Sequence, residues 1–299
     1  MSTPAVDIQD LKFAFDTTTF DFGSAQIQPG QVVVLLGPSG AGKSTLMRLL
    51  RGELDPLEGT VHITGEQVQT RKKALVLNET RAGWVPQLDD LQPMLSAREN
   101  IAHHLLRLDE EEREERVDRL LTTMHLKGYD ALPVRSLSGG QRQRVSIAKA
   151  MANEPPVLLM DESLAQLDLR TKTSILLDVK RMVRETQTAA ILVLHDPTDA
   201  LMIADELWVI RDGALVQKGH PKTIVNQPES HAIAGLFDHI NVVPRDVDIP
   251  GSWRLDGEEK WLFAHELPAL EGAEVLEVFT TPSGQMQLLA WKGLELLKK

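Results

Sequence analysis

Residues 37–45, Gly-Pro-Ser-Gly-Ala-Gly-Lys-Ser-Thr, constrain the fold of this 299-residue chain more than any other stretch. They fit a pattern in which a glycine is followed by any four residues, then by Gly-Lys and then by serine or threonine. Gly37, Gly40 and Gly42 have no Cβ, so the backbone can curl tightly and aim successive N–H groups inward. Such a row of donors suits the phosphates of a nucleotide, while Lys43 adds a positive charge and the Ser44 hydroxyl can bind Mg²⁺.

The flanks of this loop have the patterns of a buried strand and a helix. Five apolar residues, Val-Val-Val-Leu-Leu at 32–36, come before it, as in a parallel strand covered on both faces. Leu46, Met47, Leu49 and Leu50 follow at helical spacing until Gly52. The positive end of that helix would face the phosphates. The alternative, a glycine-rich turn without a ligand, requires a chance match to the pattern.

The composition is that of a globular protein with a sizeable core. Hydrophobic residues make up 42% and charged residues 25%, which fits about two domains. The formal net charge is −11, so we expect no nucleic acid among the main partners. The absence of cysteine excludes disulfides and thiolate chemistry.

We expect neither a signal peptide nor a membrane span. The first ten residues are polar and acidic, and the apolar runs are far shorter than the roughly 20 residues that cross a bilayer. ATP use would place the chain in the cytoplasm. If it works at a membrane, another chain must hold it there.

Strand-like and helix-like patterns alternate along the chain, which predicts an α/β fold with a mostly parallel sheet. Polar groups that could do chemistry follow several predicted strands, namely Gly37, Gln87, Asp161-Glu162 and His195. Ligands bind at the carboxyl ends of strands in such sheets, so we expect these groups to meet there.

Two regions depart from this alternation. Residues from about 89 to 135 are predicted to form an inserted helical subdomain, which opens on the capping pattern Ser96-Ala97-Arg98-Glu99. Residues 237–299 contain four prolines and two strand-like runs, and we interpret them as a small β-rich domain that follows a first domain at 1–236. Asp212-Gly213, between two apolar runs, predicts a hairpin.

Aromatic residues before the loop offer a surface for an adenine ring. Phe13, Phe15, Phe20 and Phe22 alternate loosely, and most of them should belong to the core. We choose Phe15 as the stacking residue, with Phe13 as the open alternative.

A second motif narrows the class of nucleotide-binding protein. Residues 137–144, Leu-Ser-Gly-Gly-Gln-Arg-Gln-Arg, resemble the signature of the ATP-binding cassette (ABC) ATPases. The family's other motifs follow in its order: Gln87, the acidic pair Asp161-Glu162 after an apolar run, Leu167-Asp168 and His195. The resemblance covers about residues 6–235. It implies a P-loop NTPase core, an antiparallel β-subdomain and a helical subdomain.

The resemblance also implies residue roles. Lys43 would bind the β- and γ-phosphates of ATP. Mg²⁺ would be held by Ser44, Gln87 and Asp161, and Glu162 would be the general base. His195 would orient the attacking water. As alternatives, a lone histidine can simply cap a strand and an acidic pair can be an ordinary loop. The full set of expected ATP contacts is Phe15, Gly37, Pro38, Ser39, Gly40, Ala41, Gly42, Lys43, Ser44, Thr45, Ser138, Gly139, Gly140 and Gln141.

The signature residues are implied to act on a second copy. In the family, the equivalents of Ser138 and Gly140 complete the ATP site of the facing subunit, and a helix amino terminus with a hydroxyl is an anion site in its own right. The resemblance therefore implies a head-to-tail homodimer with two ATP molecules between the chains. Asp168 would lie at the seam.

Neighbouring sequence resembles the ATPase subunits of bacterial binding-protein-dependent importers. The pieces are Ser96-Ala97-Arg98-Glu99-Asn100-Ile101, Leu194-His195-Asp196, and Asp212-Gly213 through Gly219 and Pro221. This implies a chain that powers solute import through a separate membrane permease, with a solute-binding protein in the full system, at the cytoplasmic face of the inner membrane. Residues 237–299 would be an oligonucleotide-binding-type (OB-like) transport-associated domain.

Two alternatives to an importer stay open at this point. The cassette could serve an exporter or an envelope-machinery complex. It could also be a non-transport ABC ATPase that acts on nucleic acid or ribosomes, although such proteins usually add coiled coils, cysteine clusters or a second cassette, and the acidic charge disfavours them.

Overall fold

The computed structural model describes residues 3–70 and 81–237 and, beyond them, six strands of the carboxyl-terminal region. The chain divides into two compact units, Met1–Lys218 and Gly219–Lys299. We describe each unit by itself. The domain boundary that we predict after residue 236 stays a prediction.

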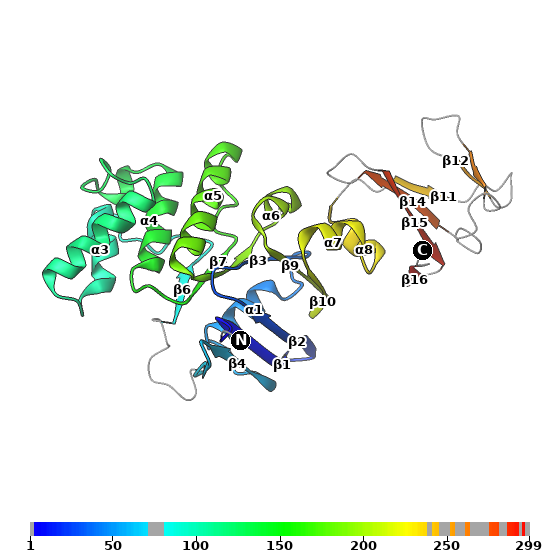
Figure 1. Ribbon diagram of the computed structural model, residues 1–299, viewed down its shortest axis with the longest axis horizontal. Coiled ribbons are helices and arrows are strands. Elements are labelled where there is room, and N and C mark those ends of the chain that lie inside the picture. The colour runs from blue at the N-terminus through cyan, green and yellow to red at the C-terminus, as the bar shows by residue number, and fades with distance from the viewer. Residues whose placement is uncertain are drawn as a thin grey trace. The chain divides into compact units, whose positions relative to one another are not determined.

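A ten-stranded sheet, in the order β5-β4-β1-β2-β10-β9-β3-β8-β7-β6, organises the first unit (Figure 1). β3, β7 and β8 are almost entirely buried, as their apolar runs predict. β3 pairs in parallel with β8 and β9, and β7 pairs in parallel with β6 and β8. The strands are β1 (Val6–Phe15), β2 (Thr18–Ile27), β3 (Val32–Leu36), β4 (Glu58–Ile63), β5 (Glu66–Gln67), β6 (Ala82–Val85), β7 (Val157–Asp161), β8 (Ala189–Val193), β9 (Glu206–Arg211) and β10 (Ala214–Gly219).

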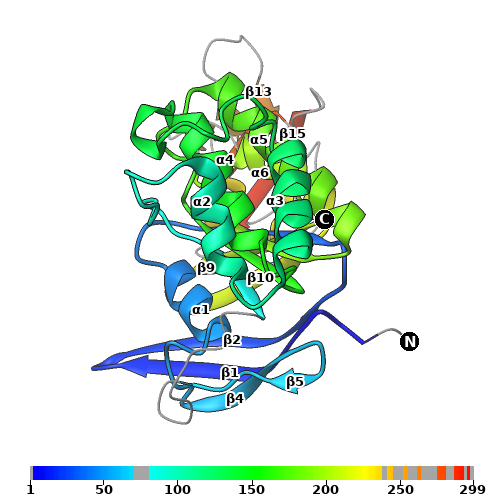
Figure 2. The same cartoon turned by 90° about the vertical axis from the view of Figure 1, so that its left-hand side faces the viewer.

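The other end of the sheet is antiparallel. β1 pairs with β2 and β4, and β4 pairs with β5. These four strands lie together on one side of α1 (Lys43–Leu50) in Figure 2. The predicted α/β core with an antiparallel β-subdomain is therefore confirmed.

In the helical region, α2 and α3 contact each other and α4, and α4 contacts the edge strand β6 of the sheet. Helical elements occupy the region where the 89–135 insertion was predicted. The α-helix α2 ends after six residues, the short 3-10 helix η1 continues it, and α3 comes next. Among the described residues, no helix combines the length and apolar composition needed to cross a bilayer. The elements are α2 (Ala97–Ala102), η1 (His103–Leu105), α3 (Glu110–Thr123), η2 (Val134–Ser136), α4 (Gly139–Met151), α5 (Leu169–Thr186) and α6 (Pro197–Ile203).

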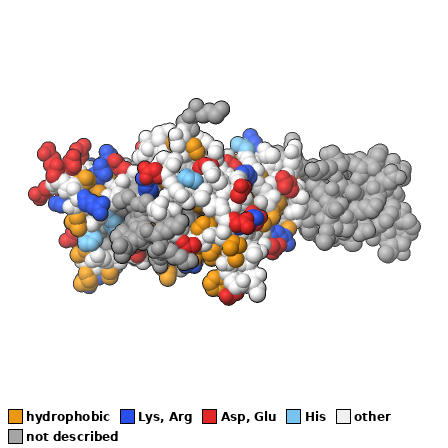
Figure 3. All heavy atoms as spheres, turned by 90° about the horizontal axis from the view of Figure 1, so that it is seen from below, with side chains coloured by type: hydrophobic (Ala, Val, Ile, Leu, Met, Phe, Trp, Pro, Cys, Tyr) orange, Lys and Arg blue, Asp and Glu red, His pale blue; other side chains and the backbone are white. Residues whose placement is uncertain are grey.

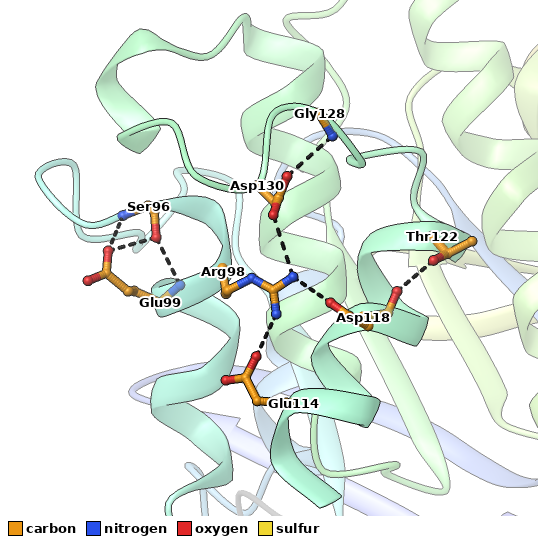
Figure 4. A network of polar contacts seen from close by, with 8 residues as sticks. All are labelled: Ser96, Arg98, Glu99, Glu114, Asp118, Thr122, Gly128 and Asp130. Carbon is orange, nitrogen blue, oxygen red and sulfur yellow. Dashed lines mark hydrogen bonds and ion pairs between the residues drawn. The ribbon is translucent and has the colours of Figure 1, made fainter. Parts of the chain in front are cut away.

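Arg98 joins the parts of the helical region to one another. From α2, its guanidinium forms ion pairs with Glu114 and Asp118 of α3 and, at 3.5 Å, with Asp130 of the loop that follows (Figure 4). These carboxylates raise the pKa of Arg98, with Asp118 as the main cause. The Ser96–Glu99 capping box predicted from sequence starts the same helix.

The Asp212-Gly213 turn joins β9 to β10 as predicted. Both residues lie in the left-handed region, with φ of 48° and 82°, as a two-residue hairpin turn of the I′ type requires. β10 continues the sheet to β2, where Ala214 lies beside Asp21.

The described residues of the second unit form two short helices and two small antiparallel sheets. β14 and β15 match the two strand-like runs predicted near residues 274–280 and 285–291 and form a hairpin. The sheet order is β11-β14-β15-β16, and β12 pairs with β13. The elements are α7 (Pro221–Asn226), α8 (His231–Ala234), β11 (Asn241–Pro244), β12 (Ser252–Arg254), β13 (Trp261–Phe263), β14 (Val275–Thr280), β15 (Met286–Lys292) and β16 (Glu295–Leu296).

Candidate active site

Two glycines of the loop between β3 and α1, Gly37 and Gly42, could not carry a side chain unless their neighbours moved. Gly37 has φ of 146°, and a Cβ there would lie 1.9 Å from the Ile210 carbonyl oxygen of β9. Gly42 caps α1 at φ 110°, and a Cβ there would lie 2.8 Å from the Phe20 ring. The loop therefore has one close-packed path from strand to helix. Phe20, which supports it from β2, is a residue that sequence reasoning assigned only to the core.

Lys43 lies inside this curl with only 4% of its surface exposed. Its ammonium donates to the carbonyl oxygens of Gly37, at 2.8 Å, and of Pro38, at 3.0 Å. Burial lowers the pKa of Lys43, and the carboxylates of Glu162 and Asp161 act in the opposite direction. The loop thus encloses one cation and has two acidic side chains close to it.

Asp161 ends β7 and faces the start of α1. The Ser44 hydroxyl donates to its Oδ1 at 3.3 Å. Burial raises the pKa of Asp161, and the Ser44 hydrogen bond offsets part of that rise. A hydroxyl and a carboxylate side by side offer the hard oxygen ligands that Mg²⁺ prefers.

Glu162 collects contacts from two neighbouring strand ends. Gln87, which follows β6, donates from its amide nitrogen to Glu162 Oε2 at 3.3 Å. His195, which follows β8, places Nε2 2.8 Å from the same oxygen. Glu162 also has φ of 49°, a strained conformation for a residue with a side chain. The structure therefore brings together Lys43, Ser44, Gln87, Asp161, Glu162 and His195.

The signature motif forms the start of α4 and satisfies its own polar groups. Ser138 caps the helix, the Gln141 N–H donates to its hydroxyl at 3.3 Å, and the Ser138 N–H donates to the Gln141 amide oxygen at 2.9 Å. Gly140 packs against α5, where an added Cβ would lie 2.4 Å from Thr171 Cγ2. Within the described part of the chain, no hydrogen bond or ion pair links Ser138, Gly139, Gly140 or Gln141 to residues 37–45.

Asp168 is exposed at the amino terminus of α5, where its carboxylate accepts from the Thr171 N–H at 3.1 Å. Hydrogen bonding by the Thr171 side chain, together with that from the Thr171 N–H, lowers the pKa of Asp168. Sequence reasoning placed Asp168 at a seam and missed this capping role. The signal was available, because an aspartate directly before a helical pattern is a strong helix cap.

The two candidate aromatic residues differ in exposure. Phe13 is partly buried against the core and lies 6.1 Å from the Phe20 ring, centroid to centroid. Phe15, at the end of β1, is 66% exposed and is free to stack on a planar ligand. The structure leaves Phe15 as the better placed of the two.

A phosphate-binding loop between a buried strand and a helix, next to acidic strand ends, defines a P-loop nucleoside triphosphatase. A profile described as "ABC transporter" matches residues 22–165. The sulfate/thiosulfate import ATP-binding protein CysA of Gloeobacter violaceus is 36% identical over 249 residues, 80% of this chain and 71% of that protein.

Solved structures agree. CbiO1 of Clostridium perfringens, described as part of the ABC transporter complex CbiONQ, aligns with a TM-score of 0.70 and 27% identity over 76% of this chain and 92% of that one. The ATP-binding cassette MJ0796, solved as a dimer with ADP and phosphate, aligns with a TM-score of 0.60 and 26% identity over 72% and 98%.

The chain belongs to the ATP-binding proteins of ABC transporters. The predictions that it is an ATP-hydrolysing subunit, and that it is of the import type, are confirmed by these relatives.

Proposed function

We propose that ATP·Mg²⁺ binds on the loop at residues 37–45 and that Glu162 is the general base for its hydrolysis. The observation that carries this proposal is the position of Glu162, which contacts both Gln87 and His195 and lies close to Lys43. Phosphoryl transfer depends on positioning and charge stabilisation, and a carboxylate held by two neighbours can orient a water molecule.

The remaining roles follow from the contacts. Lys43 and the backbone N–H groups of residues 40–45 would bind the β- and γ-phosphates, and Phe15 would stack on the adenine. Ser44 and Gln87 would hold Mg²⁺, with Asp161 acting through water, and the ion would neutralise phosphate charge. No cluster of three or more acidic, histidine or cysteine side chains in the described ranges could hold a metal alone, so the ion would depend on phosphate oxygens.

Two copies of the chain would pair head to tail. Ser138, Gly139, Gly140 and Gln141 form a helix amino terminus that is not bonded to the loop of its own chain, and such a terminus attracts anions. The second copy would bring this terminus to the γ-phosphate, with Asp168 at the seam. The dimer reported for MJ0796 supports the proposal.

The helical region would contact a separate membrane permease and so hold the chain at the cytoplasmic face of the inner membrane. Large apolar side chains stand exposed there: Leu88 at 74%, Met94 at 66% and Leu106 at 67%. Figure 3 shows hydrophobic side chains, in orange, on the surface at the left, where the helical region lies, with a group of acidic side chains, in red, nearby. A solute-binding protein would complete the system.

Asn100 would keep the start of that surface in shape. It is 3% exposed and joins α2 to the loop before it, accepting from the Gln92 N–H at 2.8 Å and donating to the carbonyl oxygens of Gln92 and Ser96. The same loop leads back to Gln87. Movement at the nucleotide would therefore reach the exposed apolar side chains through a short, well-bonded segment. Co-purification with a permease from membranes would test this contact.

Glu162→Gln tests the general base. The variant keeps the size of the side chain and loses its charge, so we expect ATP binding to persist while hydrolysis falls by about 10²–10⁴-fold. Size-exclusion chromatography with ATP should then show a trapped dimer. Exposed Glu185→Gln is the matched control and should hydrolyse ATP at the wild-type rate. Wild-type hydrolysis by Glu162→Gln would exclude Glu162 as the base.

A further inference from the structure

His195 comes directly before α6, so the start of α6 determines where its ring lies. Asp196 caps that helix by accepting from the Thr198 N–H at 2.8 Å. One turn further on, Asp199 is 5% exposed, although it carries a carboxylate. A buried carboxylate requires a partner, because an unpaired charge is strongly disfavoured away from water.

Lys172 of α5 is that partner. Its Nζ lies 2.5 Å from Asp199 Oδ2 and 4.0 Å from Asp196 Oδ2. The Lys172 side chain is 17% exposed and that of Asp199 is 6% exposed, so water screens this pair only weakly. The pair joins the first turn of α5 to the first turn of α6.

The same turn of α5 leads back to the proposed general base. The Lys172 N–H donates to the Asp168 carbonyl oxygen at 2.9 Å. Between Glu162 and Asp168 the chain forms tight turns, in which the Ala165 N–H donates to the Glu162 carbonyl oxygen at 3.2 Å. His195 then contacts the Glu162 side chain. These contacts close a ring whose members are Glu162, Asp168, Lys172, Asp199 and His195.

We propose that Lys172 and Asp199 form a positioning pair that holds His195 against Glu162 and connects this contact to Asp168. The proposal rests on the function proposed above for Glu162 and His195. If Lys172 loses its charge, Asp199 is left buried without its cation, and if Asp199 loses its charge, Lys172 keeps only the longer contact with Asp196. In both cases the link that joins the first turns of α5 and α6 is weakened, and the two turns separate. His195 then moves away from Glu162, although neither Lys172 nor Asp199 belongs to the nucleotide site.

A second ion pair on α5 provides a matched control. Lys180 Nζ lies 3.6 Å from Asp205 Oδ1, and the two side chains are 19% and 30% exposed. Asp205 lies just before β9 and accepts from the Val32 N–H, at the opposite end of β3 from the loop. Lys180→Met therefore removes the same charge from the same helix without touching the ring.

The test measures steady-state ATP hydrolysis and thermal unfolding of the full chain. We expect Lys172→Met and Asp199→Asn to lower kcat by about 10–100-fold, the effect of a small misplacement of catalytic groups, with KM for ATP changed only a few-fold. Lys172→Arg, which keeps the charge, should restore most of kcat. The double variant should be no slower than the single variants, because both remove one interaction. Lys180→Met should lower Tm and leave kcat unchanged.

A kcat for Lys172→Met equal to that of Lys180→Met would overturn the pair's role, as would additive losses in the double variant. If Lys172→Met does not fold, Asp199→Glu replaces it, since this variant keeps the charge and changes only the length of the link. A wild-type kcat in Asp199→Glu and Asp199→Asn would then overturn the role. Glu162→Gln distinguishes the proposed function of Glu162 from the proposed positioning role of Lys172 and Asp199. If Glu162→Gln is inactive while Lys172→Met is fully active, only the positioning role fails.

Discussion

Lys43 is buried and Asp161 is half-buried, although both side chains are titratable. Burial shifts the pKa of each towards its neutral form, because both lose hydration. For Asp161, the hydrogen bond from Ser44 and the nearby charge of Lys43 offset only part of this lost hydration. Such residues cost the folded protein stability, which a bound, highly charged ligand would restore.

Asp161→Asn should stabilise the chain without nucleotide. A carboxyl whose folded-state pKa is raised contributes its full stability below its unfolded pKa of about 3.9 and loses it as the pH rises through the folded pKa. At pH 7 the ionised Asp161 is therefore unfavourable, and the neutral amide should raise Tm by a few degrees. The gain should shrink as the pH falls towards 4, while ATP hydrolysis is lost at every pH.

Thermal unfolding between pH 4 and pH 8 measures this difference. Asp16→Asn, at an exposed turn between β1 and β2, is the control and should leave Tm unchanged at all pH values. A lower Tm for Asp161→Asn at pH 7 would show that the carboxylate stabilises the fold, which is the opposite of the expected effect.

Gly140 packs α4 directly against Thr171 of α5. An added Cβ there would lie 2.4 Å from Thr171 Cγ2, whereas at the preceding Gly139 the nearest atom, Leu167 Cδ2, lies at an ordinary 3.5 Å. We expect Gly140→Ala to destabilise the protein by about 1–3 kcal/mol, the usual effect of overpacking. Gly139→Ala should be neutral or should stabilise by up to about 1 kcal/mol, because alanine is the better helix former.

Denaturant unfolding of both variants checks the contrast. Thr171→Ala removes the clashing methyl group, so it should recover most of the stability lost in Gly140→Ala. Equal stabilities for Gly139→Ala and Gly140→Ala would mean that α4 and α5 separate at no cost. The coupling between the signature helix and α5 would then be looser than the structure indicates.

In the proposed dimer the two halves of each nucleotide site come from different chains, since among the described residues of one chain the start of α4 is not bonded to the loop before α1. If two chains complete each other's sites, defects in different halves should complement. Lys43→Ala removes the loop cation. Ser138→Asp keeps the helix cap, since aspartate caps as well as serine, but sets a negative charge against the phosphate. Each homodimer should be inactive.

An equimolar mixture of these two variants should regain about a quarter of the wild-type rate, because half of the randomly formed dimers are mixed and each has one intact site of two. Hydrolysis rates measured before and after mixing test this. Affinity capture of untagged Ser138→Asp by tagged Lys43→Ala provides the reference for random exchange. No recovery in the mixture, with exchange shown by the reference, would contradict a shared site.

Local patterns in the sequence predicted much of this structure. The glycines and lysine at residues 37–45, the buried apolar runs, the capping box at Ser96 and the turn at Asp212-Gly213 all depend on residues near one another in the chain. Backbone conformation and helix capping are local effects, so a single sequence carries them. The order of motifs was also sufficient to indicate the family, which the relatives confirm.

The sequence alone thus determined the loop, the elements beside it and the set of polar residues at strand ends. Only the tertiary structure decided that Gln87 and His195 meet on one oxygen of Glu162, that Asp168 caps α5, and that Lys172 pairs with Asp199. The physical reason is that most of these contacts depend on which strands become neighbours and on how α5 packs against α6. Burial over the whole chain decides which strands become neighbours. Gln87 and Glu162 are 75 positions apart, and no local sequence pattern shows that two such distant residues will meet.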